Sequence, residues 1–300
     1  MRYEYLSQHV NVFQKCTGLT VTQFDQVVND VLPAYGEAEV KRLSGRKRQR
    51  ALGAGHPYEL ELRDHILLTV IWLRLYPIHE VLGYLFGISD STVSRLIERV
   101  LPILEQNGRD EMRLPDPGRK RRRQLPELLN DIPELSVIVD SFEQRVQRPP
   151  HDESHYSGKK KQHTLKSQLA VDSNTGRIVE VSQSVPGATA DIKLLEQSGL
   201  LQRLPDEVGA GGDLAYLKLA KLRRYGFSPR RKPRGKARPP EDVIYNQTFS
   251  QWRIVVEQTI GQLRRFQSIT ATDRNHRRNH RARVTAVAGL VNRLPRFALA

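Results

Sequence analysis

A short basic segment divides this chain and most constrains what it can fold into. Residues 108–124 read GRDEMRLPDPGRKRRRQ, which is too charged and too broken by proline to bury a hydrophobic core. We therefore expect a basic linker at 108–124. Ahead of it the apolar pattern is helical, and beyond it short β-like runs alternate with helical ones. The sequence predicts an all-α region at 1–107 followed by an α/β domain at 125–300.

The charge of the chain indicates the class of its partner. Lys and Arg total 48 against 33 Asp and Glu, a formal net charge of +15. Such a chain is attracted to polyanions because each neutralised phosphate releases counterions, although charge alone names no chemistry. The single cysteine, Cys16, excludes an internal disulfide framework and a cysteine-based zinc site. No signal peptide or membrane-spanning run is present, so we expect a cytoplasmic protein.

The region from about 60 to 104 has the pattern of a helix-turn-helix. Apolar periodicity predicts a largely buried helix at about 60–75 and a short helix at roughly 78–86, with a turn at Gly87. Ser89 is a good N-cap for a third helix, whose apolar residues form one continuous stripe. This order of helix, short helix, turn and helix is typical of a DNA-binding helix-turn-helix.

The N-terminal end of the third helix carries the residues predicted to recognise DNA. In a helix-turn-helix they would reach base edges or phosphates. They are Ser91, Thr92, Ser94 and Arg95. A plain helical bundle would show the same apolar stripe, but the basic composition of the chain favours the DNA-binding interpretation.

The second part begins with a β-branched run that ends in an acid. Residues 135–140 read LSVIVD, which predicts a buried central strand that delivers the Asp140 carboxylate to a sheet edge. For Asp140 taken alone, an acid that merely ends the strand or caps a helix is the preferred interpretation. Residues 168–172 and 177–182 flank a good hairpin turn at 173–176, so we expect three consecutive antiparallel strands, the first of which ends at Asp140.

Two further acids have local patterns of their own. Asp213 follows two glycines that permit close backbone approach, although Gly-Gly-Asp by itself is only a turn. Glu257 lies in a predicted helix at 246–266, where Arg253, Glu257 and Arg264 fall within about 40° of one another at 100° per residue. A surface ion pair between Arg253 and Glu257 is the alternative interpretation.

Together the three acids indicate a metal-dependent chemistry. Carboxylates are oxygen ligands suited to Mg²⁺ or Mn²⁺. Two such ions can neutralise charge on the attacking and leaving oxygens when a phosphodiester is hydrolysed. Asp140, Asp213 and Glu257 are therefore the candidate metal ligands and catalytic residues.

One further acid, two histidines and a second basic run are alternative candidates for metal or DNA binding. Asp191 competes with Asp213 for the second position, but we interpret it as the cap of a helix at 192–201. His276 and His280 have a metal-ligand spacing without a third ligand nearby, and we expect them in a solvated or DNA-facing basic segment. The basic run at 221–238 suits a loop that follows DNA, or equally a mobile loop.

In their order, these motifs are similar to those of a known family. The chain resembles the DDE transposases of bacterial insertion sequences, in the branch related to eukaryotic PIF/Harbinger elements. The resemblance covers about Leu60 to Phe266. After the helix-turn-helix its motifs are IVDSFEQRVQRP, YSGKKKQHTLK, PGATADIKLLEQS, GGDLAYLKL and RIVVEQTIGQLRRF.

The resemblance implies an RNase H-like catalytic domain in which Asp140, Asp213 and Glu257 bind two Mg²⁺ ions, with Mn²⁺ as a substitute. The family signature Tyr-x2-Arg-x3-Glu-x6-Lys is partly kept. Arg253 and Glu257 match it, Arg264 stands in place of Lys, and Ser250 stands in place of Tyr. The change from Lys to Arg preserves the positive charge for a phosphate contact.

The implied activity is metal-dependent DNA cleavage at terminal inverted repeats, followed by strand transfer into target DNA. The expected partners are double-stranded DNA and further copies of the chain in a homo-oligomer on DNA, in the bacterial cytoplasm at the nucleoid. The residues expected to contact phosphates are Arg253, Arg264, Lys159, Lys160 and Lys161. A catalytically silent regulator derived from a transposase and a DDE nuclease without strand transfer are the alternatives. Intact acids at all three positions argue against the regulator.

Overall fold

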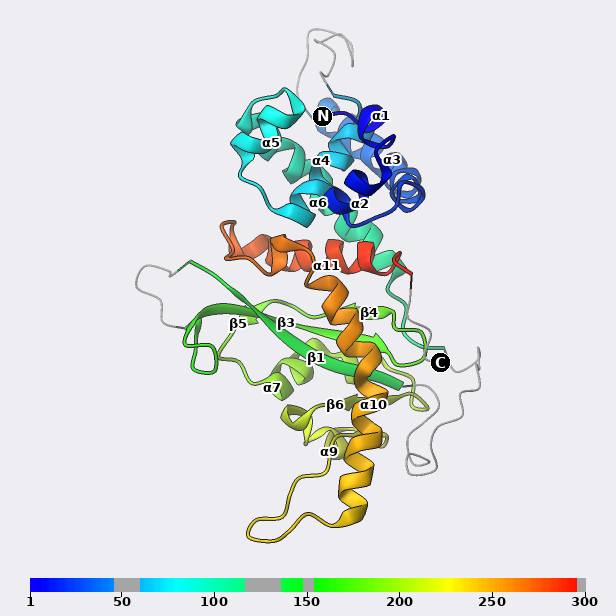
Figure 1. The fold of residues 1–300 in the computed structure, drawn as a ribbon, viewed down its shortest axis with the longest axis vertical. Coiled ribbons are helices and arrows are strands. Elements are labelled where there is room, and N and C mark those ends of the chain that lie inside the picture. The colour runs from blue at the N-terminus through cyan, green and yellow to red at the C-terminus, as the bar shows by residue number, and fades with distance from the viewer. Residues whose placement is uncertain (46–59, 117–135, 148–153, 296–300) are drawn as a thin grey trace.

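The computed structural model of the protein describes residues 1–45, 60–116, 136–147 and 154–295. Figure 1 shows a helical region at one end of the long axis and a β-sheet beyond it. Helix α11 (His280–Val291) lies between the two, and helix α10 (Pro240–Leu263) crosses the sheet.

The helical region comprises the first six helices. They are α1 (Tyr3–Leu6), α2 (Val10–Thr17), α3 (Val21–Ser44), α4 (Leu62–Leu75), α5 (His79–Phe86) and α6 (Asp90–Glu111). Helix α4 is the centre of this region, because every residue from Asp64 to Leu73 is buried. Helices α4 and α5 begin and end close to where the apolar pattern predicts them, and α6 begins directly after the predicted N-cap Ser89.

The turn between α5 and α6 is tightly built. Gly87 has a φ of 72°, the left-handed region that favours glycine. Ser89 caps α6 by accepting a hydrogen bond from the backbone N–H of Thr92 at 3.2 Å, as predicted. A Cβ on Gly83 would lie 2.6 Å from the backbone oxygen of Ile88, so the first residue after the turn packs directly on α5.

Helix α6 extends further than expected. It runs through Glu111, so the prediction of a linker is wrong for residues 108–111. The physical reason is a helix crossing: a Cβ on Gly289 of α11 would lie 2.5 Å from the Cα of Gly108. Close approach of α11 therefore gives this polar end of α6 a packing partner. Residues 117–124 of the predicted linker lie outside the described residues.

The sheet combines antiparallel and parallel pairs. Strand β1 pairs antiparallel with β3 and parallel with β6, β6 pairs parallel with β7, and β2, β4 and β5 pair antiparallel with β3. The strands are β1 (Ser136–Arg145), β2 (Tyr156–Ser157), β3 (Gln162–Asp172), β4 (Ile178–Val181), β5 (Val185–Pro186), β6 (Gly209–Gly212) and β7 (Gly226–Phe227). The predicted β1, β3 and β4 antiparallel set and its hairpin turn are confirmed, with Gly176 at a φ of 67°.

Three short helices connect the later strands. They are α7 (Asp191–Ser198), α8 (Leu200–Arg203) and α9 (Leu219–Leu222). One hydrophobic cluster joins α7 and α8 to one face of β1 through Val137 and Val139. The alternate residues Ile138 and Phe142 face the other way and belong to a cluster with α10 and α11.

That second cluster also contains the core of the helical region, including residues of α3, α4 and α6. The helical region and the face of the sheet that packs on α10 and α11 therefore share one continuous core. The predicted order of an all-α region followed by an α/β domain is confirmed. None of the described helices is long and apolar enough to cross a membrane.

Candidate active site

Asp140 and Asp213 lie side by side where a pair of parallel strands ends. The last pair in the register of β1 and β6 joins Val139 to Gly212, and the two acids are the next residues on each strand. Neighbouring strands lie about 4.8 Å apart, so the two backbones are adjacent there. The prediction that Asp140 ends its strand is wrong. Strand β1 continues to Arg145 because its other neighbour, β3, accompanies it that far.

Both acids face the side of the sheet that α10 covers. Asp140 alternates with Val139 and so shares the face of Ile138 and Phe142, which pack in the cluster with α10 and α11. Asp213 also begins a short 3₁₀ turn, where its Oδ1 accepts a hydrogen bond from the N–H of Ala215 at 2.9 Å. The turn that Gly-Gly-Asp predicts is thus present at Asp213.

Helix α10 brings basic side chains to this pair. Burial raises the pKa of Asp140, and the charge of Asp213 raises it further, whereas a backbone hydrogen bond from Ser141 and the charges of Arg253 and Arg264 lower it. The two arginines are thus electrostatic neighbours of the acid. The Nε of Arg253 is buried with no hydrogen-bond partner in the described structure, so this residue keeps a free donor.

Glu257 lies on the same face of α10 but is not gathered with the other acids. Its side chain is 61% exposed and its Oε1 lies 3.9 Å from an Nη atom of Arg253. Over the described residues, no group of three or more His, Cys, Asp and Glu side chains is close enough to hold a metal ion. The structure therefore brings two of the three predicted ligands together and leaves the third one helix turn from Arg253.

The donor chemistry of the Asp pair fits a divalent cation. Two adjacent carboxylates, one of them buried enough to raise its pKa, repel each other, and a hard cation with oxygen ligands removes that repulsion. Asp140 and Asp213 would hold such a cation directly. Glu257, 61% exposed on α10, is not within reach of the same cation in this conformation.

Asp191 belongs to a different cluster. It does not cap α7 with its side chain, because the N-cap residue is Ala190 and the helix has no side-chain cap, so that prediction is wrong. Instead Asp191 pairs with the buried Lys166 at 2.8 Å and accepts a hydrogen bond from the Oγ of Ser141 at 2.8 Å. Ser141 points to the opposite face of β1 from Asp140. Asp191 is therefore bound to Lys166 and Ser141 on the opposite side of β1 from Asp140.

Aromatic side chains occupy the space that a side chain would need at either of the two residues before Asp213, which explains why both are glycine. A Cβ on Gly211 would lie 2.0 Å from the ring of Phe227, and a Cβ on Gly212 would lie 2.5 Å from that of Tyr216. Tyr216 is buried, and its hydroxyl accepts a hydrogen bond from Gln168 at 2.8 Å. Burial raises the pKa of Tyr216, and so do the nearby charges of Asp191, Asp140 and Asp213. Sequence reasoning missed this residue, and its Gly-Gly-Asp-x-x-Tyr spacing was the available signal.

The predicted recognition residues lie at the start of α6 as expected. Ser91 and Arg95 are exposed, and Thr92 and Ser94 are half-buried. The hydroxyls of Ser91 and Thr92 both contact the Oγ of the N-cap Ser89, at 3.1 and 2.9 Å. Arg95 donates to the Oγ of Ser91 at 3.1 Å. The N-terminus of this long helix thus presents hydroxyls and a cation to solvent.

The three predicted phosphate-binding lysines are far from the Asp pair. Lys159, Lys160 and Lys161 are all exposed in the turn between β2 and β3. That turn is closed by a hydrogen bond from the N–H of Lys161 to the oxygen of Ser157 at 2.7 Å. The turn leads into β3 near Thr164, which is opposite Arg145 and five residues along β1 from Asp140. Five residues of strand span about 17 Å.

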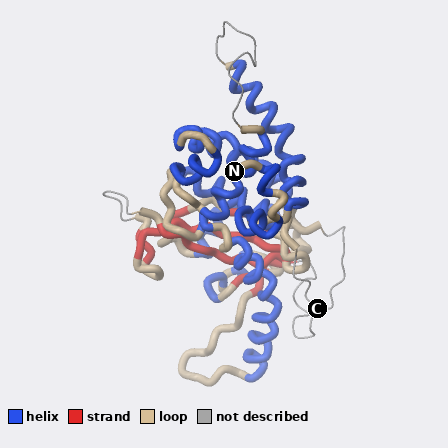
Figure 2. The backbone as a smooth tube through the Cα atoms, turned by 45° about the horizontal axis from the view of Figure 1, so that its top comes forward, coloured by secondary structure: helices blue, strands red, loops and turns tan. Residues whose placement is uncertain are grey.

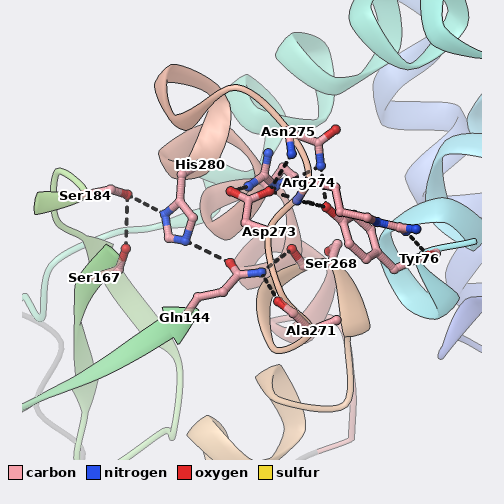
Figure 3. A network of polar contacts seen from close by, with 11 residues as sticks. Tyr76, Gln144, Ser167, Ser184, Ser268, Ala271, Asp273, Arg274, Asn275 and His280 are labelled. Carbon is pink, nitrogen blue, oxygen red and sulfur yellow. Dashed lines mark hydrogen bonds and ion pairs between the residues drawn. The ribbon is translucent and has the colours of Figure 1, made fainter. Parts of the chain in front are cut away.

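His280 does not lie in a solvated segment, so that interpretation is wrong. It is fully buried and connects β1 and the segment that precedes β5 to α11 (Figure 3). Gln144 of β1 donates through Nε2 to the oxygens of Ser268 and Ala271, so its Oε1 accepts from His280. The Nδ1 of His280 then accepts from Ser184 at 2.7 Å. Burial, with the nearby charge of Arg283, lowers the pKa of His280 to about 4, which keeps the ring neutral.

A second part of this network reaches the helix-turn-helix. Tyr76, which ends α4 with a φ of 54°, donates to Asp273, and Asp273 pairs with the buried Arg283 of α11. The side chain of Arg274 donates to the backbone oxygen of Tyr76 at 2.6 Å and lies over its ring at 4.4 Å (Figure 3). Buried polar contacts therefore join the end of α4 to the segment that precedes α11.

The comparisons with known proteins agree with this architecture. Residues 139–292 match the family described as DDE superfamily endonuclease, and residues 58–110 match the helix-turn-helix of DDE superfamily endonuclease. The first match covers half of the chain, so the protein belongs to the DDE superfamily endonucleases, and the predicted helix-turn-helix is confirmed.

A relative of similar length carries a more particular description. The chain is 26% identical over 281 residues, 93% of each protein, to a probable transposase for insertion sequence element IS702 from Microchaete diplosiphon. No solved structure matches the chain. The family membership confirms the resemblance seen in the sequence motifs, and its two matched regions imply a protein that binds DNA.

Proposed function

We propose that this protein is a transposase that cuts DNA at the terminal inverted repeats of its element and joins the freed 3′-hydroxyl to target DNA. The observation that carries the proposal is the register of β1 and β6, which puts Asp140 and Asp213 side by side under α10. The probable transposase that shares 26% identity with this chain supports the same activity.

In this proposal Asp140 and Asp213 hold Mg²⁺, with Mn²⁺ as a substitute, and Glu257 completes the ligand set by a side-chain movement from its exposed position. Bound metal would neutralise charge on the attacking and leaving oxygens of the phosphodiester. Arg253 and Arg264 bind the phosphates beside the cut, and the free Nε of Arg253 supplies a donor for that contact.

DNA recognition is assigned to the start of α6. Ser91, Thr92, Ser94 and Arg95 contact the terminal repeat, because the N-terminus of α6 presents them to solvent next to a favourable helix dipole. Lys159, Lys160 and Lys161 contact phosphates further along the duplex. A homo-oligomer on DNA would hold the two ends of the element together.

The test is a Mg²⁺-dependent assay on DNA that carries the terminal repeats. We expect cleavage and joined products from the wild type. Asp140→Asn and Asp213→Asn should each lower cleavage by at least about 10³-fold while DNA affinity is kept or raised, because the change removes a metal ligand and a negative charge. Glu257→Gln should lower cleavage similarly.

Two outcomes would contradict the proposal. Binding without cleavage by the wild type would indicate a silent regulator, and cleavage without joined product would indicate a nuclease. Full cleavage by Asp140→Asn would overturn the metal assignment. An Asp191→Asn variant tests the alternative second ligand. It should impair folding through loss of the Lys166 pair rather than change the metal dependence of cleavage.

A further inference from the structure

The segment between β7 and α10 is the most strongly charged part of the described surface that the proposed active site does not use. We call residues 228–239 the basic loop. Its sequence, SPRRKPRGKARP, contains six Lys or Arg residues and no acid. Each of the six is exposed. Figures 1 and 2 both show the loop extending beyond the sheet alongside the N-terminal half of α10.

The first of the six cations anchors the loop to α10. The side chain of Asn246 makes two hydrogen bonds with the backbone of Arg230, accepting from its N–H at 2.7 Å and donating to its oxygen at 2.9 Å. The guanidinium of Arg230 pairs with Asp242 at 3.0 Å and lies over the ring of Tyr245 at 4.3 Å. The loop is therefore held at a defined place on the helix.

The other five cations of the basic loop differ from Arg230 in their ion pairing. Within the described parts of the chain, none forms an ion pair with a carboxylate. They are Arg231, Lys232, Arg234, Lys236 and Arg238. Since the loop is anchored to α10 at Arg230, these exposed side chains form a cluster of positive charge beside the N-terminal half of the helix.

The anchor lies on the face of α10 that carries the candidate active-site residues. At 100° per residue, Asp242 and Asn246 fall within about 20° of Arg253, and Glu257 falls about 40° from it. With a rise of 1.5 Å per residue, Asn246 lies about 10 Å and Asp242 about 16 Å before Arg253 along the axis. A straight path along one helix face thus runs from the Asp pair to the basic loop.

The arrangement favours a DNA duplex over a second copy of the chain as the occupant of this path. Another copy also carries a net charge of +15, so the basic loop repels it on average, whereas phosphates neutralise the loop and release counterions. The helix-turn-helix lies at the opposite end of the long axis (Figure 1). The duplex at the basic loop is therefore on the other side of the cut from the DNA that α6 recognises.

We propose that the basic loop binds the phosphates of the DNA that flanks the element, about five to seven base pairs beyond the cut, and aligns the flank along α10. The estimate comes from the ~16–22 Å between Glu257 and the two anchor residues, divided by 3.4 Å per base pair. The inference rests on the proposed transposase function.

The experiment measures the affinity of the full chain, without divalent metal, for duplexes that carry the element end and progressively longer flanks up to about one helical turn, ~10 base pairs. Wild-type affinity should rise once the flank passes roughly five base pairs. The variant Arg231→Gln/Lys232→Gln/Arg234→Gln should lose most of that gain. Its slope of log affinity against log salt should become shallower by about 2–3, close to 0.9 for each lost phosphate contact.

Two further variants separate position from charge. Lys15→Gln/Lys41→Gln/Lys193→Gln removes the same charge from exposed sites on α2, α3 and α7, and should keep the flank-dependent gain. Asn246→Ala keeps every charge but removes the two hydrogen bonds that hold the backbone of Arg230 on α10, and should lose much of the gain.

The inference is overturned by a loop variant that keeps the gain, or that loses no more than the charge-matched control. A change of oligomeric state in the loop variant with unchanged DNA affinity would show a contact with a second copy and also overturn it. Cleavage is assayed separately in Mg²⁺. A chain that gains affinity from the flank but never cuts DNA counts against the proposed function and not against the role of the loop.

Discussion

At the scale of single residues, burial separates groups that look alike in the sequence. Asp140 and Asp191 both follow apolar or small residues, yet one faces α10 beside Asp213 and the other is paired with Lys166. His276 and His280 belong to one basic run, yet only His280 is buried. The role of each residue therefore depends on which side of its strand or helix its side chain lies.

The burial of His280 predicts a pH dependence of stability. Its pKa is about 4 in the folded protein against an ordinary 6.5, so the unfolded chain binds one more proton between these values. The free energy of unfolding should therefore fall as the pH drops from 6.5 to about 4, by up to about 1.4 kcal/mol per pH unit for this group. Denaturant unfolding across that range measures it.

The matched variant is His280→Gln. It should be less stable than the wild type at pH 7, since Ser184 and Gln144 lose their partner, but its stability should fall less steeply with acid. A shallower slope remains because burial also lowers the pKa of His65 to about 4. Equal slopes in the two proteins would show that His280 does not titrate in this way.

At the scale of elements, the helix-turn-helix depends on close backbone approach. Gly83 lies against the backbone oxygen of Ile88, and Gly87 takes the left-handed conformation between the two helices. These contacts set where the N-terminus of α6 points, and hence where Ser91 and Arg95 meet DNA. The same sequence of helices with a looser turn would be a plain bundle.

Gly83→Ala should therefore weaken DNA binding, although the substitution adds only one methyl group. The new Cβ would lie 2.6 Å from a backbone oxygen that cannot move aside without opening the turn. We expect a loss of about 1–3 kcal/mol in stability and a measurable fall in affinity for the terminal repeat. Gly36→Ala in α3 meets nothing within 4 Å and is the control, with stability unchanged or raised. Thermal unfolding and DNA titration of both variants decide the matter.

At the scale of the whole molecule, α11 joins the parts. It packs on α6 through Gly108 and Gly289, and its buried side chains share a cluster with residues of both the helical region and the sheet. The polar contacts of Tyr76 and Gln144 add to this junction. The proposed boundaries at 107 and 125 therefore divide the sequence but not the hydrophobic core.

One core predicts one cooperative unfolding transition for the full chain. Gly289→Ala should lower the melting temperature, because a methyl group must separate α11 from the backbone of Gly108 at 2.5 Å. Gly261→Ala is the control, since this exposed residue of α10 has nothing within 4 Å, and it should stabilise by up to about 1 kcal/mol. Two separated transitions in calorimetry of the wild type would contradict a shared core.

Local patterns were sufficient for much of this protein. The apolar stripe and the Ser89 cap predicted α6, the β-branched run predicted β1, and the hairpin turn predicted the pairing of β3 and β4. The acids of the candidate site could be singled out because each has a local pattern. Asp140 follows a β-branched run, Asp213 follows two glycines, and Glu257 shares a helix face with Arg253. Their order along the chain carried the resemblance to the DDE family.

The sequence by itself determined which segments form helices and strands and which acids are candidates, since those properties depend on neighbours within a few residues. Only the tertiary structure decided that β3 continues beside β1 past Asp140, that Asp191 faces away from the Asp pair and that His280 is buried. It also decided that α11 packs against Gly108, at the start of the predicted linker, and so extends the core to the end of α6. Each of these depends on a partner distant in the chain, and no local pattern records which partner will cover a given face.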